Sequence, residues 1–377
     1  MVEFSKFRPI TLILPSLFSE LKGPALPKII KEISKVKYIN HIVIGLDKAN
    51  EKEFHEAKKF FSELPQKHEI LWNDGPNLKS LDMMLAKQNL APQELGKGRN
   101  VWYCMGYILS VGKAEAVALH DCDIITYSRS LLARLVYPVA NPKFNFDFCK
   151  GYYPRVSENK VKGRVARLLV TPLLRALEKT IGFNEFISFV DSFRYPLAGE
   201  FSFRRRVLKD IRIPYDWGLE IGVLSEMYRN YAGNRLCQVD IADNYDHKHQ
   251  DIFFNDNSKG LSKMSVDIIK VIIRKLASQG EPFSMSIFRS LKATYYREAL
   301  DFVQIYKKDA LMNAYDIDVH EEETAVELFA KNIMVAGQTF LDSPMESPNI
   351  PTWSRVDTAL PGFLNDLRKA VELDNKS

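Results

Sequence analysis

Short apolar runs alternate with segments of helical spacing over the first third of the chain. The runs are "ITLILP" (10–15), "INHIVIGLD" (39–47), "HEILWNDG" (68–75) and "EAVALHDCD" (115–123). The segments with apolar residues at helical spacing are 28–36, 52–64 and 101–113. Strands that alternate with helices through short connections form a mostly parallel sheet with helices on both faces. We therefore predict an α/β fold whose ligands bind at the carboxyl ends of the strands.

The pattern becomes mixed after residue 145 and helical towards the end of the chain. Segments 145–155 and 234–243 are typical of strands, and 164–182 is typical of a helix with basic residues on one side. Amphipathic helices follow from about residue 258. We expect an α/β domain over 1–257 and a helical region over 258–377 that supplies packing and homodimer contacts.

Composition narrows the class of protein. The 377 residues carry a net charge of +5, and no block of six like charges occurs, which argues against a nucleic-acid-binding tail. Four cysteines lie far apart without metal-binding spacing, as is typical of reduced thiols. No stretch approaches the roughly 20 apolar residues of a membrane helix, and no apolar core of signal-peptide length begins the chain. We expect a cytoplasmic protein that binds neither membranes nor nucleic acid.

Asp121 and Asp123 follow the apolar run 116–119, where unpaired carboxylates are costly to desolvate. Two residues apart on an extended segment, their side chains leave the same face. Neighbouring carboxylates repel each other unless a cation lies between them, and divalent cations prefer oxygen ligands. A nucleotide diphosphate could complete such a coordination shell. The alternative is a pair of surface aspartates in a turn, which a motif this short does not exclude.

Three further motifs carry candidate functional residues. In "GKGRN" the glycines allow the backbone to approach a ligand and Lys97 offers a charge for phosphate, unless the segment is only an exposed loop. In "DHKHQ" either His247 or His249 could complete a metal site, although a single histidine is more often structural. In "DWGLE" Glu220 is either functional or stabilises the start of a helix.

A set of basic residues comes last: Arg155, Lys162, Arg164 and the run 204–206. Arginine side chains suit phosphate or carboxylate groups. Because most arginines in such a run face solvent, we expect no more than one of the three in 204–206 to be functional.

Taken in order, seven segments resemble those of one enzyme family. They are the first strand with "LPSLFSE", then "GKG", "HDCD", "GRVARLLVTPLL", "LAGEFSFRR", "WGLEIGVL" and "DHKHQ". Over roughly residues 10–250 the chain is similar to the glucosyl-3-phosphoglycerate synthases, glycosyltransferases of family 81 that are close to mannosylglycerate synthases. The resemblance implies a GT-A fold, with a Rossmann-like and mostly parallel sheet that binds a nucleotide-diphosphate sugar, followed by a helical C-terminal extension.

The resemblance also implies roles for individual positions. A divalent cation, Mg²⁺ or Mn²⁺, would be held by Asp123 and His247. The nucleotide sugar would contact Pro15, Leu17, Glu20, Asp47, Lys97, Asp121 and Asp123. The acceptor 3-phosphoglycerate would contact Arg155, Gly163, Arg164 and His249, with its phosphate on Gly163 and Arg164. Catalytic roles would fall to Lys97, to Glu220, which would orient the sugar or acceptor, and to Leu197, whose main chain would lie beside the anomeric carbon.

The implied reaction is metal-dependent transfer of glucose from GDP-glucose or UDP-glucose to 3-phosphoglycerate. Its product, glucosyl-3-phosphoglycerate, is a precursor of the compatible solute glucosylglycerate. In the resembling family the anomeric configuration is retained. Retention by double displacement would require a carboxylate nucleophile near the anomeric carbon. The sequence offers no obvious candidate, so we favour front-face attack by the acceptor hydroxyl.

The chain departs from the family pattern at three places. Ala166 stands where the family often has threonine, 248–250 is Lys-His-Gln where Arg-Asn-Arg is common, and "LAGE" replaces Leu-Gly-Gly-Glu. The first two leave open transfer of mannose, or transfer to unphosphorylated glycerate or another small acceptor. A nucleotidyltransferase would usually have a glycine-rich loop after the first strand, which "PSLFSELKG" is not. The non-enzymatic alternative is a degenerate scaffold whose helical tail binds a partner.

Overall fold

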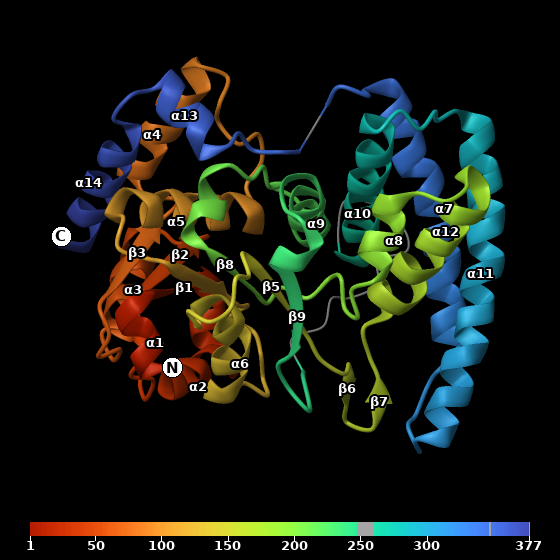
Figure 1. Cartoon of the computed structure of the whole chain (residues 1–377), viewed down its shortest axis with the longest axis horizontal. Helices are drawn as coiled ribbons and strands as arrows, with labels where there is room; N and C mark the ends of the chain where they lie inside the picture. Colours follow the sequence, from red (N-terminus) through yellow and green to blue (C-terminus); the bar gives the residue numbers. More distant parts are fainter. Residues whose placement is uncertain (247–259, 347, 377) are drawn as a thin grey trace.

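The computed structural model describes residues 1–246, 260–346 and 348–376. Figure 1 shows a sheet with its covering helices on one side of the molecule and a bundle of long helices on the other. Within the described residues the main sheet has seven strands in the order β3-β2-β1-β4-β8-β5-β9. These strands are β1 (Ile10–Leu17), β2 (Ile39–Asp47), β3 (His68–Trp72), β4 (Ala116–Leu119), β5 (Phe148–Tyr152), β8 (Phe201–Arg204) and β9 (Leu236–Asp240).

All strands of this sheet except β8 run in the same direction. β1 is parallel to β2 and β4, β2 to β3, and β5 to β9, whereas β8 is antiparallel to both β4 and β5. β4 lies at the centre and all four of its residues are buried, as its continuous apolar sequence predicts. The predicted mostly parallel α/β sheet is therefore confirmed. The carboxyl ends of the parallel strands and the start of β8 meet at one edge.

Helices cover both faces of the sheet and enclose two apolar clusters. The first cluster lies under α2, α3 and α6, and the second under α4, α5 and α9 together with the C-terminal α13 and α14. The helices of this part, including short 3₁₀ helices, are α1 (Val2–Phe7), η1 (Phe18–Lys22), α2 (Ala25–Ile33), α3 (Glu51–Phe61), α4 (Pro76–Lys87), α5 (Lys97–Val111), α6 (Arg129–Ala140), η3 (Arg205–Lys209), α9 (Leu219–Asn230), η4 (Gly233–Arg235), α13 (Trp353–Ala359) and α14 (Phe363–Lys376).

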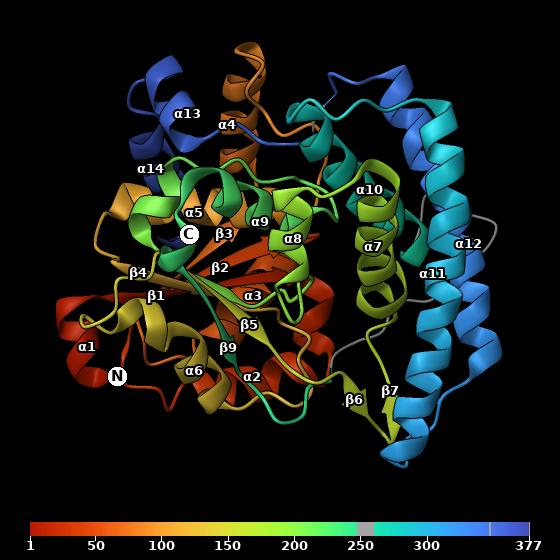
Figure 2. The same ribbon diagram turned by 45° about the vertical axis from the view of Figure 1, so that its right-hand side comes forward.

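A third apolar cluster holds the helical bundle together beside the sheet. Its elements are the π-helix η2 (Val165–Val170), α7 (Thr171–Ile181), α8 (Glu185–Asp191), α10 (Gly260–Ser278), α11 (Met285–Met312) and α12 (Val319–Asp342). A small hairpin, β6 (Val156–Ser157) with β7 (Lys160–Val161), reaches from the sheet to the lower end of α11 and α12 (Figures 1 and 2). The predicted helical C-terminal region is confirmed. None of the described helices combines the length and apolarity that crossing a membrane requires.

The structure differs from the sequence-based expectations in local detail. β8 and α4 were not predicted, α5 begins at Lys97 rather than at residue 101, and the first turn of the helix predicted over 164–182 is a π-helix. The proposed boundary between 257 and 258 lies outside the described residues and stays a prediction.

Candidate active site

Lys97 lies between two carboxylates at the carboxyl edge of the sheet. Its Nζ atom is 2.6 Å from Oδ1 of Asp121 and 3.0 Å from Oε1 of Glu220. The three residues come from different elements: Lys97 begins α5, Asp121 follows β4 by two residues, and Glu220 lies in the first turn of α9. The fold thus brings together three residues that the sequence analysis assigned to one site.

One ammonium facing two carboxylates leaves this group with a net negative charge. Burial on its own would lower the pKa of Lys97, but the charges of Asp121 and Glu220 outweigh it and raise the pKa above its usual value. Lys97 is therefore protonated at neutral pH. A diphosphate that approached the group would still meet net negative charge, so binding it favourably requires a further cation nearby.

The turn 197–199 lies directly against this ion group. A Cβ atom on Gly199 would be 2.4 Å from Oδ2 of Asp121 and 2.9 Å from Nζ of Lys97, so only a residue without a side chain fits there. Leu197, two residues earlier, is half-buried and contacts the apolar cluster of the helical bundle. The "LAGE" motif therefore places main chain, rather than side chains, beside the charged centre.

Lys150 on β5 holds the same turn through a hydrogen bond, and the sequence analysis missed it. Its side chain on β5 is buried, and Nζ donates a hydrogen bond of 2.6 Å to the carbonyl oxygen of Ala198. Burial lowers the pKa of Lys150 to about 8, although nearby Glu220 and Glu200 raise it. A lysine inside the apolar run "FDFCKGYY" was the available signal, because a buried ammonium needs partners.

Glu200 is buried and accepts hydrogen bonds from the hydroxyls of two stacked tyrosines. Oε2 accepts a hydrogen bond of 2.8 Å from the hydroxyl of Tyr153, and Oε1 accepts one of 2.6 Å from Tyr245. The two rings stack with centroids 3.5 Å apart and an angle of 6° between their planes. Burial and the charge of Asp121 raise the pKa of Glu200, while both hydrogen bonds lower it. Both oxygens are thus engaged in a rigid network.

Asp123, the predicted metal ligand, lies on the loop after β4. The chain returns to this loop after β9: Ile125 N donates to the carbonyl of Asp246 over 2.8 Å, and Asp246 N donates to Oγ1 of Thr126 over 2.9 Å. His247 and His249 lie outside the described residues. Over 1–246, 260–346 and 348–376, no group of three His, Cys, Asp or Glu side chains is placed to hold a metal ion.

The residues predicted to bind the nucleotide line the ends of β1 and β2. Pro15 and Leu17 are among the last three residues of β1, and Leu17 is exposed. Burial raises the pKa of the Cys122 thiol, and the negative charges of Asp121, Asp123 and Glu20 raise it further. Asp47 ends β2, where it accepts a hydrogen bond of 2.8 Å from Asn73.

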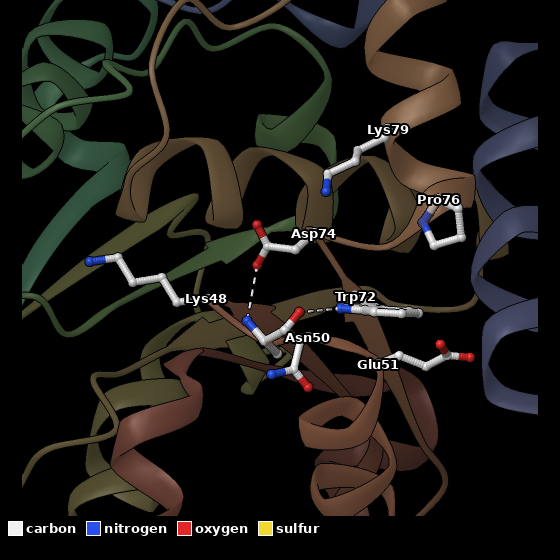
Figure 3. A pocket seen from close by; sticks show the side chains of 8 residues that line it. Lys48, Asn50, Glu51, Trp72, Asp74, Pro76 and Lys79 are labelled. Carbon is white, nitrogen blue, oxygen red and sulfur yellow. Dashed lines mark hydrogen bonds between the residues drawn. The ribbon is translucent and has the colours of Figure 1, made fainter.

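A pocket of about 510 Å³ opens at the ends of β2 and β3 (Figure 3). Its floor is fixed by two hydrogen bonds to Ala49: Trp72 Nε1 donates to the carbonyl over 2.7 Å, and Oδ2 of Asp74 accepts from the amide over 3.2 Å. Lysines and carboxylates share the rim. The lining residues are Lys48, Ala49, Asn50, Glu51, Trp72, Asp74, Pro76 and Lys79.

The predicted acceptor residues Arg155 and Gly163 meet at the base of the β6–β7 hairpin. Gly163 has φ +74°, and a Cβ atom there would lie 3.1 Å from Cβ and Cγ of Arg155. The Arg155 guanidinium carbon is 5.6 Å from the ring centre of Tyr245 and 6.0 Å from that of Tyr195. In the described part of the chain, no carboxylate oxygen lies within 4.0 Å of an Arg155 nitrogen. Its guanidinium can therefore receive an anion.

Arg164, in contrast, is already paired with two carboxylates of α12. Nε is 3.2 Å from Oε1 of Glu322, and Nη2 is 3.0 Å from Oε1 of Glu321. An arginine has five N–H donors, and these contacts with described residues use only Nε and Nη2, which leaves the donors of Nη1 for a ligand. Arg155 reaches Tyr245, Tyr245 contacts Glu200, and Glu200 adjoins Gly199, so the acceptor residues connect with the ion group through direct contacts.

The interpretation of the glycines in "GKGRN" needs correction. Gly96 and Gly98 approach the backbone of residues 214–215 rather than an open site: a Cβ atom would lie 2.5 Å from the Tyr215 carbonyl oxygen and 1.8 Å from that of Pro214, respectively. These glycines therefore seat the start of α5 and so place Lys97. The run 204–206 lies at the opposite edge of the sheet, where its arginines pair with Glu115 and Asp147.

Comparison with known proteins identifies the family. The chain is 46% identical over 372 residues to the glucosyl-3-phosphoglycerate synthase of Persephonella marina, covering 99% of this chain and 92% of that protein. The protein belongs to the glucosyl-3-phosphoglycerate synthase family. The enzyme of the same name from Methanococcoides burtonii is 36% identical, with 98% and 91% covered. The present chain is therefore a glycosyltransferase, as predicted. A search of family models found no match.

Solved structures of more distant relatives share the fold. The glucosyl-3-phosphoglycerate synthase of Mycobacterium tuberculosis, in complex with Mn²⁺, UDP and glucosyl-3-phosphoglycerate, superposes with a TM-score of 0.52 at 20% identity, covering 75% of this chain and 84% of that one. The mannosyl-3-phosphoglycerate synthase of Rubrobacter xylanophilus gives 0.54 at 20% identity, with 75% and 79% covered. These likenesses confirm the GT-A architecture expected for the family.

Proposed function

We propose that this member of the family transfers glucose from a nucleotide-diphosphate glucose to 3-phosphoglycerate in a metal-dependent reaction that retains the anomeric configuration. The observation that carries the proposal is the ion group of Lys97, Asp121 and Glu220 against the turn 197–199. Two curated relatives bear the name of this activity, and a M. tuberculosis structure contains Mn²⁺, UDP-glucose and phosphoglyceric acid. UDP-glucose is accordingly our first donor, with GDP-glucose as the alternative.

Asp123 and His247 would hold the cation. Carboxylate and imidazole are suitable ligands for Mn²⁺, and carboxylate also for Mg²⁺. When bound, the cation neutralises the charge of the diphosphate leaving group. The chain's own Lys97 cannot do this alone, because the two negative charges of Asp121 and Glu220 already exceed its single positive charge.

The donor would lie across the ends of β1, β2 and β4. Pro15, Leu17 and Glu20 would contact the base and ribose, together with Asp47. An ammonium has three N–H donors, and two of those of Lys97 face carboxylates, so the third is available to the diphosphate or the sugar. Asp121 would contact the ribose or the sugar, and Glu220 would orient the sugar or the acceptor.

The acceptor would bind between the ion group and α12. Arg155 supplies a guanidinium without a carboxylate partner in the described residues, and Arg164 supplies its remaining donors beside Gly163. Ala166 is buried and has no hydroxyl group, so binding of the acceptor phosphate would depend on the arginines. His249 stays a prediction for this site.

Two carboxylates near the turn are poorly placed as nucleophiles. Both oxygens of Glu200 accept hydrogen bonds from tyrosines, and Glu220 is paired with Lys97. This supports front-face attack by the acceptor hydroxyl, in which the main chain at Leu197 would lie beside the anomeric carbon. The neighbouring Ala198 carbonyl is held by Lys150. A covalent glycosyl adduct trapped on Glu200 or Glu220 and found by mass spectrometry would refute this mechanism.

A product assay tests the function. UDP-glucose, GDP-glucose and GDP-mannose are each offered with Mn²⁺ or Mg²⁺ against 3-phosphoglycerate and against glycerate, with Asp123→Ala as the control. We expect glucosyl-3-phosphoglycerate, abolished by EDTA and by Asp123→Ala. Transfer only to glycerate would show that the acceptor is unphosphorylated, and transfer only from GDP-mannose would show that the sugar is mannose. No reaction with any donor would reject the proposal. The homodimer stays a prediction, for which light scattering is the measurement.

A further inference from the structure

A buried carboxylate of α12 joins the predicted acceptor turn to the helical bundle. The side chain of Glu322 is 3% exposed and faces two arginines that flank the start of η2. Arg167 binds it through both terminal nitrogens, with Nη1 2.7 Å from Oε2 and Nη2 3.1 Å from Oε1. Arg164 Nε donates to Oε1 over 3.2 Å. One carboxylate thus orients two guanidinium groups that lie three residues apart.

Other contacts between the same elements restrict the turn further. Nε of Arg167 donates to the carbonyl oxygen of Lys162 over 2.8 Å, and its guanidinium carbon is 4.6 Å from the ring centre of Tyr306 on α11. The β6–β7 hairpin pairs with the chain before α12, where Asp316 N donates to the carbonyl oxygen of Asn159 over 2.7 Å. The turn that carries Gly163 is therefore held by α11 and α12, which are distant in sequence.

Glu322 and its neighbour Glu321 contact the same arginine in different surroundings. Glu321 has a side-chain exposure of 51%, so water and salt weaken its attraction to Arg164. Glu322 is buried, where a charge pair is much less screened and removal of one partner leaves the other charge uncompensated. Orientation of Arg164 therefore depends on Glu322 and little on Glu321.

We propose that Glu322 is a positioning residue of the acceptor site, which holds Arg164 so that its free donors face the phosphate of the acceptor. This inference rests on the proposed function and assigns the helical C-terminal region a part in acceptor recognition. Glu322 itself does not touch the substrate. Glu322 sets the direction of the Arg164 guanidinium, and this matters because a planar guanidinium binds an anion well only when its N–H groups point towards the anion.

Steady-state kinetics of Glu322→Gln test the proposal, with Glu321→Gln as the matched variant. For Glu322→Gln we expect the KM for 3-phosphoglycerate to rise roughly 10-fold or more, as for other residues that orient a ligand-binding group, with the KM for UDP-glucose unchanged. For Glu321→Gln the KM for 3-phosphoglycerate should change less than about 3-fold. A purely structural role would instead alter both Michaelis constants, or only the midpoint of thermal unfolding.

Binding of inorganic phosphate, measured by calorimetry, separates this inference from the proposed function. If the wild type transfers no glucose to 3-phosphoglycerate, the proposed function fails, while weaker phosphate binding by Glu322→Gln than by Glu321→Gln still supports the positioning role. Should Glu322→Gln not fold, Glu322→Asp keeps the charge, shortens its reach and should show an intermediate shift. Equal phosphate affinity and equal acceptor KM in folded variants and wild type would overturn the inference.

Discussion

The ammonium of Lys97 separates two carboxylates that would otherwise repel each other across the proposed donor site. In Lys97→Met, Asp121 and Glu220 lose their common partner, and the diphosphate of the proposed nucleotide sugar loses an N–H group that could bind it. We expect kcat/KM for the donor to fall roughly 100-fold or more, the usual effect of removing one preorganised electrostatic group. Lys87→Met, on an exposed position of α4, is the control and should leave kcat/KM unchanged. Comparable rates for both variants would exclude the role of Lys97.

Gly199 is the position where a single methyl group should disturb the ion group. In Gly199→Ala the Cβ atom would overlap Asp121 and crowd Nζ of Lys97, so the pair must move apart. Since misplacement by about 1 Å can cost roughly 100-fold in rate, we expect a loss of that order in kcat. Gly233→Ala is the matched control, because no atom lies within 4 Å of its Cβ position. Unaltered turnover by Gly199→Ala would show that the turn is not close to the reacting atoms.

Lys150 should give the protein a distinctive stability profile above neutral pH. Its pKa is about 8 in the folded chain, where burial disfavours the charge, and 10.5 is the ordinary value. Between these values the unfolded chain binds the extra proton, so the free energy of unfolding contributed by Lys150 increases as the pH rises from about 8 to about 10.5. Relative to Lys150→Met, the wild type should gain up to about 3 kcal/mol over this window.

Urea unfolding of the wild type and Lys150→Met from pH 7 to 10.5 measures this gain. Lys143→Met, on an exposed lysine of the same segment, serves as the control and should track the wild type at every pH. A constant difference between wild type and Lys150→Met would mean that the Lys150 ammonium is not penalised by burial.

Individual site residues could be predicted where a short motif displays them, and were missed where the site depends on long-range pairing. Lys97, Asp121 and Glu220 stand in recognisable motifs, and the structure brings them together. The contacts of Glu322 with Arg164 and Arg167 join positions 158 and 155 residues apart. The hydrogen bond from Lys150 to Ala198 spans 48 residues, and no local spacing reveals any of these contacts. Family resemblance could supply a role for Arg164 but not its carboxylate partners.

At the scale of elements, apolar runs located the strands that are buried on both faces and lie parallel. β8 (Phe201–Arg204) was missed because it is only four residues long and directly follows the "LAGE" motif, although its apolar and polar residues alternate as in a strand. The π-helix at Val165–Val170 could not be foreseen from helical spacing, which does not distinguish it from an α-helix. The glycines of "GKGRN" indicate a ligand-binding loop when only the sequence is read. Glycine is required wherever something approaches the backbone closely, and the sequence does not show whether that neighbour is a ligand or, as here, another part of the protein.

α13 should depend on one aromatic contact with α5. The rings of Trp353 and Trp102 stack at 4.0 Å, and Nε1 of Trp353 donates to the Trp102 carbonyl oxygen over 3.0 Å. Trp353→Ala leaves a large cavity and should reduce the free energy of unfolding by about 3–5 kcal/mol. Chemical denaturation measures the loss. Trp217→Ala, at a partly exposed tryptophan, should cost less than half as much, and equal costs would contradict a special role of the stack.

At the scale of the whole molecule, the end of the chain returns to the sheet that the beginning builds. α13 and α14 lie beside α4 and α5, on the side of the molecule that also carries the N-terminus (Figure 1). The side chain of Asn375 pairs with both backbone groups of Ile70 on β3: its Oδ1 accepts from the amide over 3.0 Å and its Nδ2 donates to the carbonyl over 2.8 Å. α14 therefore covers the exposed edge of the sheet, which otherwise would invite pairing with another chain.

A chain that ends at residue 345 should therefore fail as a folded protein, although it retains every proposed site residue. It would expose the apolar faces of α4 and α5 and the edge of β3, so we expect aggregation and loss of a cooperative thermal transition. Asn375→Ala removes only the edge bonds and should cost about 1–3 kcal/mol. A peptide of residues 346–377 added in trans should restore solubility if the docking surface is intact. A truncated chain that stays monodisperse, with its unfolding midpoint within about 3 °C of the full chain, would show instead that these helices are an appendage.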